Sequence, residues 1–450
     1  MPVLDQPSQV DAFLQRIRQQ ADTRYVYTYP FKGAYRPLPP TTALAGWDGH
    51  HGHMNIYIHI PYCDMKCSFC NLLTTTGYTA TSLEEYVSAL CNEIALVGAV
   101  RDWTPLEVDS VYIGGGTPSV LKDAALQSVI SALIRTFTFP RSPSWSIEAT
   151  PDSVDSRRLS SIRALGFDRI SFGIQTFDPR ELRAMGRPYE PKLGDHAVAS
   201  ALAVGFPDVN VDLMYGLPGQ SMGSWLNSLR AAISLEAPTI TIYPLVFRTQ
   251  TKTGRVHGCS PAAFPDGTAR YAFHDAAVEL LSAHHYSRYS AVGFTRLGHG
   301  CRHETNEFLG VPTLGFGAGA LTYAPAVHYS SGAYANLESP RQTLVAYLSQ
   351  LATSKLPART GFILDEDERR RRAIILGLSH AGLDTVRFSS LFGANPDAFY
   401  STEMTALRTE RLVDEDSSCV RVTSSGWRVL SHIADLFASP AVSSLAATYK

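Results

Sequence analysis

Short apolar strands alternate with helix-like stretches through the first half of the chain. Six runs rich in β-branched and aromatic residues have the character of strands, at residues 55–60, 108–116, 145–150, 169–175, 209–216 and 239–247. Helix-like stretches lie between them, for example residues 82–98 and 123–137. Such alternation favours parallel pairing with right-handed crossovers. We therefore predict an α/β fold built on a partial (β/α)6 barrel, an open version of the eight-fold barrel.

Three cysteines directly follow the first predicted strand. Cys63, Cys67 and Cys70 have the spacing C-x3-C-x2-C, in a loop at the barrel end where catalytic groups gather. Three thiolates can bind three irons of a [4Fe–4S] cluster and leave the fourth iron open to a small molecule. A structural zinc site would need a fourth ligand, but His59 lies within the strand and no second C-x2-C pair exists. We therefore interpret the three cysteines as catalytic metal ligands.

Length and composition are those of a globular protein of two or three domains. The 450 residues are 45% hydrophobic and 18% charged, which is enough for a large core. A net charge of −2 argues against non-specific nucleic-acid binding, which needs a basic surface. The N-terminus lacks the pattern of a signal peptide, and no run of 18 apolar residues occurs. We therefore expect a cytoplasmic protein that neither spans a membrane nor depends on disulfides.

The chain divides into four expected regions. Residues 1–54 form an arm or a lid, with a helix at about Gln9–Gln20 and then an aromatic, proline-rich stretch too broken for regular structure. Residues 55–258 carry the partial barrel. Residues 259–355 extend the sheet, at 286–308 and through a strand at 314–323. Residues 356–450, beginning at a linker, form a small winged-helix-like domain, in which the basic run 369–372 is expected to form helix ion pairs on a solvated face.

Several motifs resemble those of radical S-adenosylmethionine (SAM) enzymes, beginning with the cysteine pattern and Phe69 before its last cysteine. More specifically, the chain is similar to the oxygen-independent coproporphyrinogen III oxidase family from about Asn55 to the C-terminal helix. The shared motifs, in order, are YIHIPYC, GGGTPS, SIEATPDS, GFDRISFGIQTFD, LRAMGRPY and VDLMYGLPGQ. The resemblance implies a [4Fe–4S] cluster whose open iron binds the amine and carboxylate of SAM, and cleavage of SAM to a 5′-deoxyadenosyl radical.

The resemblance also implies two bound SAM molecules. The cluster-bound molecule would contact Tyr57, Gly115, Glu148 and, on its far side, Leu321. The second would be held by Phe69, Gly116, Thr117, Gln175, Arg187 and Asp212. These residue types suit the task, because glycines allow a ligand to approach the backbone and carboxylates accept hydrogen bonds from ribose hydroxyls or amines. The Arg187 guanidinium can pair with a carboxylate.

Two departures from the family pattern bear on the reaction. In the oxidase a further cysteine closely follows the last cluster cysteine, whereas Asn71 and Leu72 stand here. The segment HETNEF, residues 303–308, differs from the His-Asn-x-x-Tyr-Trp-like segment of the haem-chaperone branch. The remaining branch contains methyltransferases and cyclopropanases, in which the second SAM supplies a carbon to an sp2 carbon of the substrate. We therefore predict methylation or cyclopropanation of a natural product, as in antibiotic biosynthesis.

Two other functions stay open. One is a coproporphyrinogen oxidase-like or haem-ring-opening tetrapyrrole enzyme. The other is a haem carrier, with axial ligands from His257, His284, His285, His299 and His303. The expected partners are an unsaturated or aromatic small molecule and a flavodoxin- or ferredoxin-type electron donor, with a partner methyltransferase as a further candidate. Substrate specificity is expected in the arm and the C-terminal domain, which carry no readable motif.

Overall fold

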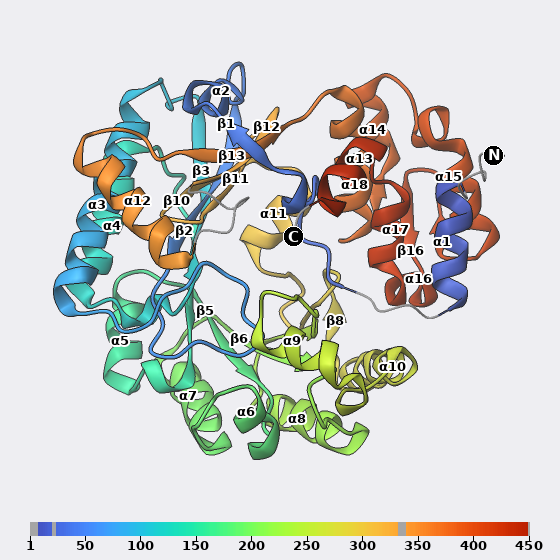
Figure 1. Cartoon of the computed structure of the whole chain (residues 1–450), viewed down its shortest axis with the longest axis horizontal. Coiled ribbons are helices and arrows are strands. Elements are labelled where there is room, and N and C mark those ends of the chain that lie inside the picture. The colour runs from blue at the N-terminus through green and yellow to red at the C-terminus, as the bar shows by residue number, and fades with distance from the viewer. Residues whose placement is uncertain (1–7, 20–23, 332–338, 449–450) are drawn as a thin grey trace.

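The computed structural model describes residues 8–19, 24–331 and 339–448. Six consecutive parallel strands form its centre: β2 (Gly52–Ile60), β3 (Leu106–Gly115), β4 (Ser144–Ala149), β5 (Arg169–Gln175), β6 (Asp208–Tyr215) and β7 (Thr239–Pro244). The helices between them lie outside the curved sheet (Figure 1). They are α3 (Ala80–Ala99), α4 (Asp123–Thr136), α5 (Ser156–Ala164), α6 (Pro179–Ala184), α7 (Pro191–Val204) and α8 (Met222–Ser234). The predicted fold class is confirmed.

The strands form where the sequence is apolar on both faces. Almost every residue of β5 and β6 is buried, because helices cover one side of the parallel sheet and the barrel interior lies on the other. The one partly exposed residue of β6 is Asp212. Helix α3 begins at a capping box formed by Thr79 and Ser82, and it packs Leu90 and Ile94 into the core. With the rest of β6 buried, Asp212 is the β6 side chain that is accessible from the barrel interior.

Further strands widen the sheet at both edges. β10 (Thr313–Phe316) pairs in parallel with β2, and it is followed by antiparallel β11 (Leu321–Tyr323), β12 (Val327–Ser331), β13 (Arg359–Ile363) and β1 (Arg36–Leu38). β9 (Gly293–Thr295) and β8 (Ser287–Arg288) extend the β7 edge. The prediction of one strand at 314–323 is wrong: Gly317 has φ +100° and Gly319 has φ +87°, and the chain turns back there.

The segment after the barrel contains more helix than the sequence indicated. It holds α9 (Lys252–Cys259), α10 (Gly267–Ala283), α11 (Arg302–Phe308) and α12 (Pro340–Ala352). The HETNEF segment therefore lies in a helix and not in a sheet extension. The expected linker near residues 355–361 runs into β13, a strand of the main sheet. Short 3-10 turns occur at Lys32–Ala34, Pro118–Val120, Pro151–Ser153 and Pro261–Ala263.

The N-terminal arm connects the C-terminal domain to the main sheet. Its helix α1 (Gln9–Arg18) packs on α17 (Leu430–Leu436), and β1 then joins the sheet beside β13 before α2 (Pro40–Ala45) (Figure 1). The arm is thus not wholly irregular, contrary to expectation. A local sequence pattern did not indicate β1, because its one strand partner among the described residues, β13, is remote in sequence.

The C-terminal domain has the element order of a winged helix. It comprises α13 (Glu366–Leu378), β14 (Leu383–Asp384), α14 (Thr385–Phe392), α15 (Pro396–Thr409), β15 (Val413–Glu415), β16 (Cys419–Val422), α16 (Ser424–Arg428), α17 and α18 (Pro440–Ala447). The predicted ion pairs are present at 2.6 Å between Arg370 and Glu366 and at 2.7 Å between Arg371 and Asp367. The side chains of Arg370 and Arg371 are only 15% and 14% exposed, so these two arginines do not lie on the solvated face that was expected. Among the described helices, none is long and apolar enough to cross a bilayer.

Candidate active site

The cysteine loop lies at the C-terminal end of β2, against a cavity of about 320 Å³ that all three cysteines line. Neighbouring backbone holds the loop in place. The Cys63 N–H donates to the Thr75 carbonyl at 3.0 Å, and the Ser68 N–H donates to the Met185 carbonyl at 3.0 Å. The Thr253 N–H in turn donates to the Ser68 carbonyl at 2.9 Å. The loop is therefore fixed from β2, α6 and α9 together.

Three thiols are the kind of ligands that hold an iron–sulfur cluster. In the described part of the chain, no three histidine, cysteine or acidic side chains converge as the ligands of one metal ion do. A cluster makes a different demand, because each thiolate binds a separate iron. All three cysteines are free, and burial raises the pKa of Cys63 to about 11. Iron binding would therefore displace a thiol proton, and the soft sulfur set fits a [4Fe–4S] cluster.

Each glycine of the GGG motif meets other protein atoms. A Cβ on Gly114 would lie 3.0 Å from the Glu148 carboxylate, and one on Gly116 would lie 2.4 Å from the Tyr62 carbonyl. Gly115 has φ +114°, which disfavours a side chain, and its N–H donates to Glu148 Oε2 at 2.9 Å. We expected the glycines to admit a ligand. Gly115 and Gly116 do line the cysteine cavity, but the closest neighbours of all three glycines are in the protein itself.

This crowding gives a stability prediction for Gly116→Ala. The added methyl group would overlap the Tyr62 carbonyl, so we expect the free energy of unfolding to fall by about 1–3 kcal/mol. Gly258→Ala on α9 is the matched control, because a Cβ there meets nothing within 4 Å and alanine favours a helix. Thermal unfolding of the two variants measures the effect. An unchanged Tm for Gly116→Ala would contradict the close contact.

Glu148, at the end of β4, is surrounded by protein but partly accessible from the cavities. Its Oε1 accepts a hydrogen bond from the Tyr112 hydroxyl at 3.0 Å, and its Oε2 accepts the Gly115 N–H. Burial, together with the negative charge of Asp212, raises the pKa of Glu148 to about 7. The carboxyl group therefore changes charge near neutral pH and can respond to a cationic ligand.

Asp212, in the middle of β6, is held by its neighbours on the sheet. Asn210 Nδ2 donates to its Oδ1 at 2.7 Å, and the Ser171 hydroxyl donates to its Oδ2 at 3.2 Å. Burial raises the pKa of Asp212, while the Arg169 guanidinium opposes that rise. With Glu148 on β4, it places two acceptor groups on the same inner surface.

Arg187 and Gln175 differ in how many of their hydrogen-bonding groups have a partner within the protein. The Arg187 guanidinium donates to Cys67 Sγ at 3.3 Å, to the Gly173 carbonyl and to the Tyr189 hydroxyl at 2.6 Å. It therefore braces the cysteine loop, in addition to any contact with a SAM carboxylate. Gln175 has a buried Oε1 without a hydrogen-bond partner in the described structure, on the wall of the cysteine cavity. A buried, unpaired acceptor at this place suits a ligand that donates a hydrogen bond.

A second cavity, of about 290 Å³, adjoins the first inside the barrel. Gly115, Glu148 and Asp212 line both. Every residue that was expected to contact the cluster or SAM lines one of these two cavities. The cysteine cavity adds Phe69, Gly116, Thr117, Gln175 and Arg187, which were expected to hold the second SAM molecule. Tyr57 and Leu321, expected to contact the cluster-bound molecule, line the adjoining cavity. The assignment of residues to the two molecules thus stays a prediction.

Several residues that the sequence did not place in contact with the cluster or SAM line both cavities. Tyr25 comes from the arm, and its ring lies edge-on to Tyr243 at 5.1 Å between centroids. Asn71 and Leu72 follow the last cysteine, and Arg248 follows β7. The aromatic character of the arm was a signal for Tyr25. For Arg248 no local signal existed, because only the fold brings the end of β7 beside the cysteine loop.

The five histidines considered as haem ligands do not gather at one place. His303 lines the second cavity, where its Nδ1 lies 2.9 Å from the Ser110 hydroxyl. His257 stacks on Phe247 at 3.6 Å between ring centroids. His284, His285 and His299 are exposed. In the described structure, His303 is therefore the one member of this set on a cavity near the cysteines.

Comparison with known proteins identifies the family. Residues 57–232 match the family model of the radical SAM superfamily, and residues 364–429 match that of the HemN C-terminal domain. The heme chaperone HemW of Escherichia coli (strain K12) is 31% identical over 267 residues, which cover 59% of this chain and 69% of that protein. The chain belongs to the HemN/HemW family of radical SAM proteins, which are coproporphyrinogen III oxidase-like.

Two further comparisons cover more of the chain. The heme chaperone HemW of Bacillus subtilis (strain 168) is 26% identical over 379 residues, which cover 82% of this chain and 95% of that protein. The solved structure of coproporphyrinogen III oxidase (HemN) from Escherichia coli has a TM-score of 0.80 at 22% identity, and the match covers 92% of this chain and 97% of that one. This HemN/HemW protein therefore shares the HemN fold, and family membership implies a [4Fe–4S] cluster and SAM.

Proposed function

We propose that the protein is a radical SAM enzyme that uses two SAM molecules to transfer a methyl or methylene carbon to an sp2 carbon of an unsaturated natural product. The observation that supports this best is the pair of adjoining cavities, about 320 and 290 Å³, that share Gly115, Glu148 and Asp212. Two ligands bound next to each other on a common wall react at the high effective concentration of an intramolecular reaction. When bound, the cluster and SAM supply a 5′-deoxyadenosyl radical.

The protein's own groups would bind and orient these ligands. The ionised Glu148 carboxylate and Asp212 can accept hydrogen bonds from amines or ribose hydroxyls, and the unpaired Gln175 Oε1 can accept another. Arg187 donates a hydrogen bond to Cys67 Sγ and so helps to keep the cysteine loop in its conformation. Tyr25, lying over the cavities, would exclude water from the radical.

Leu72 favours carbon transfer over porphyrinogen oxidation. It stands where the oxidase family carries its additional cysteine, and it lines both cavities. A leucine offers neither a proton nor a hydrogen-bonding group at that position. The substrate would meet an apolar side chain where the oxidase presents a thiol.

A tetrapyrrole function is the second candidate, and the comparisons favour it. Relatives that are 26–31% identical are named heme chaperone HemW, and the HemN fold extends over 92% of the chain. A third cavity, outside the other two, has a volume of about 1040 Å³. This volume exceeds the range of about 300–1,000 Å³ usual for small-molecule sites, so a molecule as large as a tetrapyrrole is compatible with it.

An isotope experiment separates the two candidates. The reconstituted enzyme is incubated anaerobically with a reductant and SAM carrying a deuterated methyl group. We expect deuterium in 5′-deoxyadenosine, because the radical would abstract it from the methyl group of the second SAM. Unlabelled SAM gives the background for mass spectrometry.

Two outcomes would contradict carbon transfer. One is unlabelled 5′-deoxyadenosine together with decarboxylation of coproporphyrinogen III, which would establish the oxidase reaction. The other is a Soret band on haem titration without any 5′-deoxyadenosine, which would establish haem binding.

A further inference from the structure

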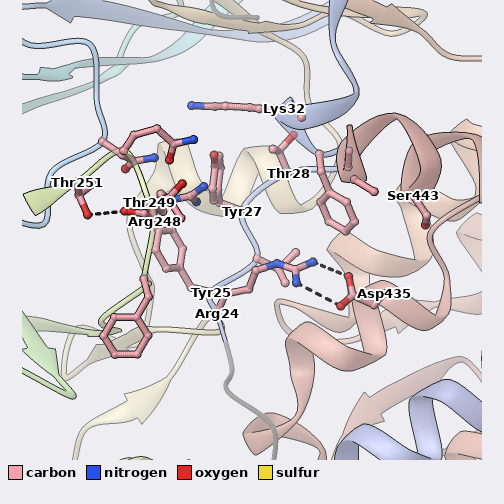
Figure 2. Close-up of a pocket in the computed structure, with 18 of the residues that line it drawn as sticks. Arg24, Tyr25, Tyr27, Thr28, Lys32, Arg248, Thr249, Thr251, Asp435 and Ser443 are labelled. Atoms are coloured by element: carbon pink, nitrogen blue, oxygen red, sulfur yellow. Dashed lines mark hydrogen bonds and ion pairs between the residues drawn. The ribbon is translucent and has the colours of Figure 1, made fainter. Parts of the chain in front are cut away.

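The outer chamber, the cavity of about 1040 Å³, lies between parts of the chain that are far apart in sequence. The arm contributes residues 24–28 and 31–33, the cysteine loop contributes Lys66 and residues 70–73, and the segment after β7 contributes residues 247–251. Helices α17 and α18 contribute the opposite wall (Figure 2). The chamber contacts Cys70 directly, so a molecule bound there would lie beside the cluster site.

The lining of this chamber is strongly basic. Its described lining contains five cationic side chains, Arg16, Arg24, Lys32, Lys66 and Arg248, against one carboxylate, Asp435. Asp435 already pairs with Arg16 at 3.1 Å and with both nitrogens of the Arg24 guanidinium. The whole chain has a net charge of −2. The positive potential is therefore local to the chamber, and it would attract an anion.

Arg248 is the basic residue best placed for this role. It is half-buried, and it lines the outer chamber, the cysteine cavity and the cavity beside it. In the described part of the chain its guanidinium makes no hydrogen bond or ion pair with another residue. A guanidinium presents a planar fork of donors that matches a carboxylate. Arg248 thus faces the chamber with its donors available to a ligand.

The backbone of Arg248 is fixed relative to the cysteine loop. Its carbonyl accepts hydrogen bonds from the Thr251 N–H at 2.9 Å and the Thr251 hydroxyl at 2.8 Å (Figure 2). A Cβ on Gly254 would lie 2.0 Å from the same carbonyl oxygen, so only glycine permits this packing. The Thr253 hydroxyl donates to the Ser68 hydroxyl at 2.8 Å, which ties α9 to the cysteine loop. The guanidinium is therefore carried by a segment that is already ordered before a ligand binds.

Aromatic and aliphatic side chains line the chamber together with Arg248. The rings of Tyr25 and Tyr27 are 5.5 Å apart between centroids, and both line the chamber with Phe247 and Leu72. Figure 2 shows Tyr25, Tyr27 and Arg248 near one another, with Arg24 reaching from beside Tyr25 to Asp435. This combination suits a molecule with an aromatic body and one anionic end.

We propose that Arg248 binds the carboxylate of the substrate and so orients its unsaturated body past Tyr25 toward the cluster cavity. That the bound molecule is the substrate rests on the proposed function. That the bound group is a carboxylate is inferred from the basic lining of the chamber and from the available donors of Arg248. Arg248 acts here as a positioning residue, because it holds the end of the molecule remote from the reacting carbon.

The test uses two probes that differ in charge alone. Pyrenebutyrate and pyrenebutanol share an aromatic body, and equilibrium dialysis against the cluster-loaded enzyme gives a Kd for each. We expect Arg248→Gln to raise the Kd of pyrenebutyrate about tenfold, as loss of a charged hydrogen bond of roughly 1.4 kcal/mol would do. The Kd of pyrenebutanol should stay within twofold. Arg255→Gln, an exposed arginine on the same helix as Gly254, is the matched control and should change neither value.

Three other outcomes would overturn the assignment, and a fourth would overturn the proposed function alone. Equal binding of the two probes to the unaltered enzyme would exclude a carboxylate site in the chamber. An equal loss of both probes in Arg248→Gln would mean that the variant disturbs packing and not charge recognition. A tenfold rise in the KM for SAM, with no change for pyrenebutyrate, would assign the guanidinium to the SAM carboxylate. Charge-dependent binding without deuterium transfer would overturn the carbon-transfer function and leave the carboxylate site standing.

Discussion

Cys70→Ser is expected to abolish reductive cleavage of SAM. Cys70 is one of three thiols on the cysteine cavity, and a serine hydroxyl is a poor ligand for iron in a cluster. Even groups that only support metal ligands are worth roughly 10–100-fold in affinity or activity, so loss of a ligand should cost more than about 100-fold. The measurements are iron and sulfide content after reconstitution and the rate of 5′-deoxyadenosine formation.

Cys259→Ser is the control for this prediction. Cys259 is an exposed thiol at the end of α9, and it lines neither the cysteine cavity nor its neighbour. Its replacement should leave iron content and cleavage at the level of the unaltered protein. Normal iron content and cleavage in Cys70→Ser would mean that this thiol is not a cluster ligand.

Glu148→Gln is expected to raise the KM for SAM by about 10–100-fold. The ionised carboxylate accepts hydrogen bonds that a neutral amide accepts more weakly, and bonds to charged groups contribute about 1.5–3 kcal/mol. Because the pKa of Glu148 is raised to about 7, its ionised fraction grows as the pH rises through neutrality. In the unaltered enzyme the KM for SAM should therefore fall between about pH 6 and pH 8, and in Glu148→Gln it should not.

The same carboxyl group also makes the stability depend on pH. As the pH rises, the affinity for SAM should increase, whereas the free energy of unfolding should decrease. In the SAM-free protein, Glu148 keeps its proton up to about pH 7, whereas the unfolded chain loses it near the ordinary pKa of 4.5. The folded state binds more protons between these values, so the free energy of unfolding should fall as the pH rises from about 4.5 to 7. Glu148→Gln should flatten this slope, as measured by urea unfolding at several pH values.

Glu279→Gln, an exposed glutamate on α10, is the matched control for both measurements. It should leave the KM for SAM and the slope of stability against pH as they are. If Glu148→Gln also leaves both unchanged, then Glu148 neither binds SAM nor titrates near neutral pH.

Much of the fold and of the candidate site could be predicted because the signals are local. Strand and helix patterns lie within short segments, and parallel strands bring their C-terminal ends to one edge of the sheet. Cys63 was expected at this end of the barrel because it follows β2, and the family resemblance added Glu148 on β4 and Asp212 on β6; all three line the cysteine cavity. The short strand β1 was missed, because its pairing with β13 joins two ends of the chain.

The sequence by itself predicted the six-stranded parallel core through its periodicity, and its resemblance to the coproporphyrinogen III oxidase family supplied the set of residues expected around the cluster and SAM. Only the tertiary structure decided what those residues contact. It showed that Gly116 makes room for the Tyr62 carbonyl, that Arg187 braces Cys67, and that the arm encloses a basic chamber with Arg248. The physical reason is that these contacts join segments remote in sequence, whose distances are set by packing and not by local pattern.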